Sequence, residues 1–76
     1  MTNSLTKFGE NLRKIRQIKR ISQIDLAKSV GVDPTFISKL ELGKRLPSLP
    51  ILVRIADALN VTVDELLDNN TPAASR

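Results

Sequence analysis

The chain has 76 residues and a formal net charge of +4, and it contains no Cys, His, Trp or Tyr. A chain of this length forms one domain that buries only about 60% of its extended-chain surface. The missing residue types exclude disulfides, thiolate or histidine metal sites and a Ser-His-Asp triad, so we expect no metal and no cofactor. The sequence holds neither a secretory signal nor an apolar run of the ~20 residues that span a bilayer. We therefore expect a cytoplasmic protein without a membrane partner.

Apolar residues recur at helical spacing and predict the first two of five short helices. The first helix is expected over about 6–19, and Ser22 is a candidate N-cap for the second because its hydroxyl can accept from an amide of the next turn. Gly31 can adopt the left-handed conformation that ends the second helix. The residues of these two helices expected to face the core are Phe8, Leu12, Ile15, Leu26, Ala27 and Val30.

The third helix is predicted over about 34–42. Asp33 is its expected N-cap, Pro34 suits its first position because a proline has no amide to leave unpaired, and Gly43 follows as its stop. Its inward-facing apolar residues are Ile37 and Leu40, and Phe36 flanks them as a partial core residue.

The last two helices are also marked by their capping residues. Ser48 is the expected N-cap of the fourth helix, and Thr62 with Glu65 forms a capping box that opens a short fifth helix. The core-facing residues of these helices are Leu52, Ile55, Ala56, Leu59 and Leu66. The sequence thus predicts an all-α, compact five-helix bundle over residues 1–67, followed by a disordered tail over 68–76.

The joint between the second and third helices has the residues that a helix-turn-helix motif needs. Ala27 is small where the next helix crosses, Gly31 allows a positive φ, and five apolar positions lock the two helices at a large angle. All these requirements are met within 23–42, which is the predicted motif. An ordinary helical hairpin is the alternative interpretation.

The charge is unevenly divided along the chain. Residues 1–45 carry ten Lys and Arg against four Asp and Glu, a net +6, whereas residues 46–76 carry two against four, a net −2. A basic half of this kind favours a polyanionic partner such as nucleic acid. A solvated surface that only aids solubility is the alternative.

The chain resembles the Cro/phage-repressor-like (XRE-type) helix-turn-helix regulators over about residues 6–67. The stretches that carry the resemblance are Leu12-Arg13-x-Ile15-Arg16, Ser22-Gln23-x-x-Leu26-Ala27, Gly31-Val32-Asp33, Ile37-Ser38-x-Leu40-Glu41-x-Gly43-Lys44-Arg45-x-Pro47-Ser48 and Ile55-Ala56-x-Ala58-Leu59. The resemblance implies a transcription regulator, not an enzyme, that binds double-stranded operator DNA as a homodimer. By its length the chain is similar to the free-standing members, such as Cro-like phage regulators and restriction–modification controller proteins.

The outward face of the third helix is the expected base-reading surface. On a helical projection, the residues opposite Ile37 are Thr35, Ser38, Lys39 and Leu42. Thr35 and Lys39 lie one turn apart and are the candidate base readers in the major groove, with Ser38 as a weaker candidate. A phosphate contact or a solvated charge is the alternative for Lys39. The family often has a long polar residue at Pro34, so one reading position is lost or moved.

Five residues are expected to contact the DNA backbone. The resemblance gives this role to Gln23, with Ser22 beside it at the start of the second helix, where free amides attract phosphate. Lys44 and Arg45 follow the third helix and should reach the backbone. Leu42 stands where the family often has a polar phosphate contact.

Two further expectations concern Glu41 and Arg20. Glu41 falls on the inner side of the third helix, where a lone charge is costly, and the resemblance implies an ion pair with Arg16. Arg20 stands where the family often has Gly, so a left-handed conformation there would be strained by about 1 kcal/mol.

The dimer surface is predicted from apolar residues that lie off the core stripes of the last two helices. These are Ile51, Val53, Val63 and Leu67, which could form a two-fold patch on a protein that binds a pseudo-palindromic site. Scattered surface apolarity is the alternative. A second hypothesis for the whole chain is a protein-interaction module on the same fold, such as an antitoxin or anti-repressor subunit, which would not read DNA.

Overall fold

The computed structural model describes residues 4–67, with side chains from residue 6 onward. This part of the chain contains five α-helices and no strand: α1 (Ser4–Ile18), α2 (Gln23–Val30), α3 (Pro34–Glu41), α4 (Leu49–Leu59) and α5 (Val63–Leu67). The predicted all-α five-helix bundle is therefore confirmed. The tail predicted over 68–76 lies outside the described residues.

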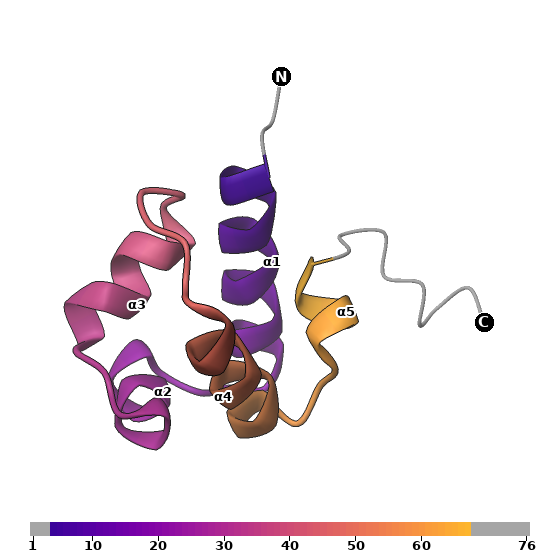
Figure 1. Cartoon of the computed structure of the whole chain (residues 1–76). Helices are drawn as coiled ribbons and strands as arrows, with labels where there is room; N and C mark the ends of the chain where they lie inside the picture. Colours follow the sequence, from indigo (N-terminus) through magenta and orange to yellow (C-terminus); the bar gives the residue numbers. More distant parts are fainter. Residues whose placement is uncertain (1–3, 68–76) are drawn as a thin grey trace.

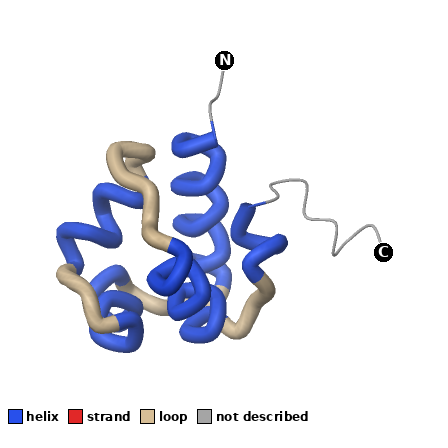
Figure 2. Tube along the Cα trace, in the orientation of Figure 1, coloured by secondary structure: helices blue, strands red, loops and turns tan. Residues whose placement is uncertain are grey.

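The helix α1 stands in the middle of the view, with α2 and α3 on one side of it and α5 on the other (Figure 1). It packs against α3 and α5, while α4 packs against α2 and α5 and so closes the bundle. The connections are short, and the longest joins α3 to α4 over residues 42–48 (Figure 2). The turn between α2 and α3 has only three residues, which holds these two helices against each other as a unit.

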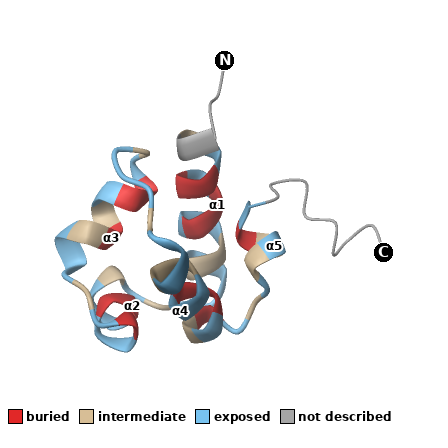
Figure 3. Cartoon of the chain, in the orientation of Figure 1, coloured by how far each residue is buried: buried red, intermediate tan, exposed pale blue. Residues whose placement is uncertain are grey.

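Every helix contributes buried residues to the core (Figure 3). The large side chains that are fully buried are Leu12, Leu26, Ile37, Leu40, Ile55, Leu59 and Leu66. All of them were expected from the helical periodicity. Ile15 and Leu52 also lie on predicted core stripes, but they are only partly buried at the edge of the core.

Four of the helices end in the same backbone turn, the Schellman motif, in which a left-handed residue lets the next amide return to a carbonyl five residues earlier. The left-handed residues are Arg20, Gly31, Gly43 and Asn60. The returning bonds run from Ile21 to Arg16, Val32 to Ala27, Lys44 to Lys39 and Val61 to Ala56, at 2.9–3.0 Å. After α1, α2 and α4 the returning residue is apolar and packs on the core, so the turn also aims the chain into the next helix.

The expected N-caps are present with one correction. Ser22 Oγ accepts from the Asp25 amide at 3.0 Å, and Ser48 Oγ accepts from the Ile51 amide at 3.4 Å. The box at α5 is reciprocal: the Thr62 amide donates to Glu65 at 2.8 Å, and the Glu65 amide donates to Thr62 Oγ1 at 3.1 Å. Asp33 occupies the N-cap position of α3, but its side chain makes no capping hydrogen bond, so that part of the prediction is wrong.

The helix α5 is held by a side chain from α1. Asn11 is buried, and its Nδ2 donates to the carbonyls of Glu65 at 2.6 Å and Leu66 at 2.8 Å. A five-residue helix is not stable by itself, because nucleating a helix costs more than its first hydrogen bonds return. Asn11 and the buried Leu66 therefore fix α5 on the bundle.

Replacing Arg20 with Gly is expected to raise the free energy of unfolding by about 0.5–1 kcal/mol, because Arg20 has a φ of 60°. A glycine adopts this conformation without the Cβ clash. The control is Arg20→Ala, which removes the same charge but keeps the Cβ. Denaturation in urea compares the two, and a Gly variant no more stable than the Ala variant would show that the turn is unstrained.

Candidate nucleic-acid interface

The two faces of α3 differ in burial as the projection predicted. Ile37, Leu40 and Glu41 are buried, whereas Thr35 and Lys39 are exposed. Leu42 caps the helix and is 62% exposed, and Ser38 is partly covered. Since residues four apart lie on one side of a helix, Thr35 and Lys39 occupy the same outward face.

Two basic residues lie in the loop that follows α3 in the sequence. Lys44 and Arg45 are both exposed in the loop after α3. The guanidinium of Arg45 lies over the ring of Phe36, with Cζ 5.6 Å from the ring centroid, which keeps its charge beside α3. Phe36 is partly buried against the core, as expected for its position.

The N-terminus of α2 supplies further donors. Ser22 is exposed and Gln23 is partly buried. The hydroxyl of Ser22 is engaged as the cap, and the backbone amides of Gln23 and Ile24 have no hydrogen-bond partner within residues 4–67. Free amides at a helix N-terminus are suited to bind an anion.

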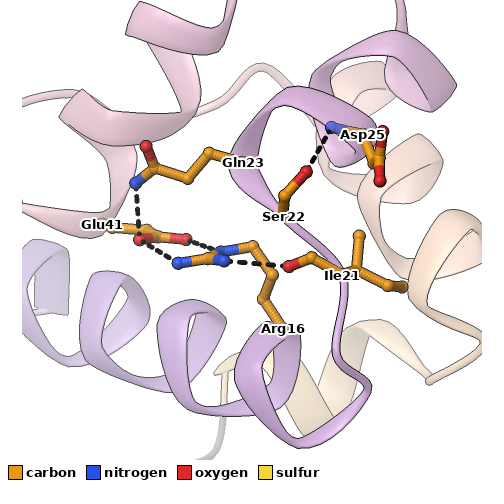
Figure 4. A network of polar contacts seen from close by, with 6 residues as sticks. All are labelled: Arg16, Ile21, Ser22, Gln23, Asp25 and Glu41. Atoms are coloured by element: carbon orange, nitrogen blue, oxygen red, sulfur yellow. Dashed lines mark hydrogen bonds and ion pairs between the residues drawn. The ribbon is translucent and has the colours of Figure 1, made fainter.

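A partly buried polar network joins α1, α2 and α3 (Figure 4). Arg16 Nε donates to Glu41 Oε2 at 2.5 Å, and Arg16 Nη2 donates to Glu41 Oε1 at 3.2 Å. Gln23 Nε2 also donates to Glu41 Oε1, at 3.0 Å, and Arg16 Nη1 donates to the carbonyl of Ile21 at 2.9 Å. The carboxylate of Glu41 therefore has two partners, Arg16 and Gln23, and the Glu41 side chain is only 4% exposed.

The network couples the position of α3 to its neighbours. The two-fold Arg16–Glu41 contact has the bidentate geometry in which guanidinium and carboxylate bind most strongly. The sequence resemblance indicated this pair, but not the bond from Gln23. Gln23 and Glu41 are 18 positions apart on different helices, so no local sequence pattern reveals their contact.

The residues of the predicted dimer patch divide into two groups. Val53 on α4 and Leu67 on α5 are 42% and 52% exposed, whereas Ile51 and Val63 are largely packed against the chain's own core. Leu49, one turn before Val53 on α4, is 70% exposed and was not expected in the patch. The large exposed apolar side chains of α4 and α5 are therefore Leu49, Val53 and Leu67.

The described residues contain no group of three or more carboxylate, His or Cys side chains that could hold a metal ion. None of their helices is both long and apolar enough to traverse a bilayer.

The helix-turn-helix family matches residues 12–66, which is most of the chain. The protein belongs to this family, in its XRE-type branch. Helix-turn-helix relatives include the control protein C.MunI of a Mycoplasma species, which is 36% identical over 70 residues that cover 91% of this chain and 95% of C.MunI. The HTH-type transcriptional regulator YazB of Bacillus subtilis is 37% identical over 59 residues, or 78% of this chain and 86% of YazB. The chain spans about half the length of two further relatives, the HTH-type transcriptional regulator YqaE of Bacillus subtilis and the cryptic phage CTXphi transcriptional repressor RstR of Vibrio cholerae.

Solved helix-turn-helix structures are similar throughout the bundle. The restriction–modification controller protein C.AhdI of Aeromonas hydrophila has a TM-score of 0.79 and 39% identity, covering 82% of this chain and 94% of C.AhdI. The P22 c2 repressor, solved in complex with a synthetic operator, has a TM-score of 0.77 and 34% identity with the same coverage. This helix-turn-helix protein is therefore a transcription regulator with a DNA-binding fold, and it is not an enzyme.

Proposed function

We propose that this regulator binds a pseudo-palindromic operator as a homodimer, with α3 of each subunit in the major groove. The observation that carries the proposal is the division of α3, which buries Ile37, Leu40 and Glu41 and leaves Thr35 and Lys39 exposed. A helix of this kind fits the width of the major groove, where base edges can be distinguished. The similar P22 c2 repressor was solved in complex with a synthetic operator, which supports operator DNA as the partner.

The base readers are Thr35 and Lys39, with Ser38 as a secondary contact. The ammonium group of Lys39 can donate to O6 and N7 of guanine, and Thr35 can bond a base edge or touch a thymine methyl. Pro34, in the first turn of α3, has no side-chain donor, so base discrimination depends on Thr35 and Lys39, which lie one turn apart on the exposed face.

The backbone contacts come from two segments that flank α3. At the start of α2, Ser22, Gln23 and the two free amides would bind a phosphate. After α3, Lys44 and Arg45 would neutralise phosphates, and Leu42 would lie against a deoxyribose. This set fixes the register of α3 on the duplex without reading sequence.

The experiment that tests the proposal starts with duplexes selected by the wild-type protein from a random DNA pool. Lys39→Ala is expected to weaken the selected site by about 1–3 kcal/mol and to relax its sequence preference. Lys44→Ala is expected to weaken binding to all duplexes by the same factor. It should also make the negative slope of log affinity against log salt less steep by about 0.9. Binding titrations at several salt concentrations measure both effects.

The matched control is Lys28→Ala, which removes an exposed lysine of α2 that lies outside the proposed contacts. If Lys39→Ala lowers the affinity for every duplex by the same factor, Lys39 contacts a phosphate and not a base. A wild-type protein that selects no duplex would sink the proposal and favour the protein-interaction module.

Dimerisation would use the apolar surface of α4 and α5. The double variant Val53→Asp/Leu67→Asp is expected to sediment as a monomer of 8.4 kDa and to lose most of its affinity for a two-half-site operator. Two half-sites lie about 34 Å apart, and a dimer contacts both at once. The control Ile18→Asp changes a 70% exposed side chain of α1 outside this surface. A double variant that stays dimeric would place the interface elsewhere.

A further inference from the structure

Gln23 connects the proposed DNA-contact surface with the buried ion pair. Its Nε2 donates to Oε1 of Glu41 at 3.0 Å, and the same oxygen receives Nη2 of Arg16 at 3.2 Å (Figure 4). The other oxygen of Glu41 is occupied by Nε of Arg16. Glu41 therefore does more than neutralise Arg16, because one of its oxygens also holds an amide from α2.

The bond to Glu41 leaves Gln23 able to donate once more. A side-chain amide nitrogen carries two hydrogens, and Glu41 takes one of them. No other partner of the Gln23 side chain occurs within residues 4–67. The second hydrogen is therefore available to an acceptor outside the chain, next to the free amides of Gln23 and Ile24.

The charge balance allows a phosphate to approach this point. A lone carboxylate beside the phosphate contact would repel it, but the guanidinium of Arg16 is bonded to both oxygens of Glu41. The pair is neutral as a unit, so the carboxylate can hold Gln23 without opposing the DNA. A glutamine without such an anchor would have to lose its rotamer freedom when DNA binds, which weakens the complex.

We propose that Glu41 is a positioning residue for DNA binding, whose carboxylate fixes the amide of Gln23 so that its second hydrogen donates to a backbone phosphate. This inference rests on the phosphate contact assigned to Gln23 in the proposed function. It gives the ion pair a second role besides tying α1 to α3, since the same carboxylate sets the geometry of a DNA contact on α2.

The mutational test is a double-mutant cycle on a duplex selected by the wild-type protein. Gln23→Met keeps the shape of the side chain but removes the donor, and it is expected to weaken binding about tenfold. The salt slope should not change, because a neutral donor releases no counterion. Glu41→Asp withdraws the carboxylate by one methylene and should cause a loss of similar size, while the double variant should lose no more than either single variant.

The control for a purely structural effect is Ile55→Val. It removes one buried methyl group from the core but leaves Arg16, Gln23 and Glu41 unchanged, so the folded variant should bind DNA within about twofold of the wild type. Affinities are compared at a temperature where circular dichroism shows each variant folded. Wild-type affinity in Glu41→Asp, or a double variant whose loss is the product of the two single losses, would overturn the inference.

A measurement on the wild-type protein keeps the test independent of variant stability. The NMR order parameter of the Gln23 side-chain NH₂ group should be high in the free protein, whereas that of Gln17, an exposed glutamine of α1, should be low. Equal mobility of the two groups would overturn the positioning role. If the wild-type protein prefers no duplex, the proposed function itself is wrong. If specific binding is unchanged in Gln23→Met, only this inference is wrong.

Discussion

Glu41→Ala is expected to lower the free energy of unfolding by about 3–5 kcal/mol, because it leaves a buried charge without its partner. The side chain of Arg16 is only 12% exposed, so little water reaches it to replace the lost carboxylate. Gln23 loses its acceptor at the same time. A domain of this length has a total stability of about 4–11 kcal/mol, so the loss removes much of it. Urea denaturation at neutral pH measures the difference.

The destabilisation expected for Glu41→Ala comes from the unpaired charge of Arg16 and not from the loss of the attraction within the pair. Replacing both partners in Arg16→Met/Glu41→Leu removes both buried charges, and the double variant is expected to recover much of the stability that Glu41→Ala loses. An unfolding midpoint of Glu41→Ala equal to that of the wild type would contradict this account, since it would mean that Arg16 reaches solvent when Glu41 is removed.

Local features of the fold could be predicted from the sequence because their causes lie within a few residues. Ser22, Ser48 and the Thr62–Glu65 box act on amides three positions away, and Gly31 and Gly43 act on the turn in which they stand. The burial of α3 follows from its period in the same way. The helical period alone therefore predicts correctly that Thr35 and Lys39 are exposed on the side of α3 opposite the buried Ile37.

The contacts that sequence reasoning missed depend on how the helices pack. Asn11 lies 54 and 55 positions from the carbonyls that it binds, and Gln23 lies 18 positions from Glu41. The exposed Leu49 was overlooked because it opens its helix, where no core stripe is yet defined. The residue types alone gave no signal, since an asparagine or a glutamine on a helix is most often solvated.

Gly9 is another residue whose role comes only from packing. It is buried in α1 at the point where the end of α3 crosses. A Cβ at this position would collide with the carbonyl oxygen of Leu40 and lie 2.5 Å from that of Glu41. Both obstacles are backbone atoms of the helix end that carries the ion pair, so a side-chain rotation cannot relieve the clash.

Gly9→Ala is therefore expected to destabilise the domain by about 3 kcal/mol or more, although alanine is favoured over glycine in a helix by about 1 kcal/mol. The steric term exceeds the propensity term because α3 must move away from α1 as a whole. The same displacement pulls Glu41 from Arg16 and tilts Thr35 and Lys39, so operator affinity should fall even at temperatures where the variant is folded.

Gly31→Ala provides the matched control for this prediction. A Cβ on Gly31 meets nothing within 4 Å, but its φ of +88° makes any side chain strained, at a cost of about 1–2 kcal/mol. The two variants separate close approach from backbone conformation, and denaturation curves compare them directly. If Gly9→Ala proves no less stable than Gly31→Ala, then α3 can shift without loss, and the tight crossing of α1 and α3 is not what holds the reading helix in place.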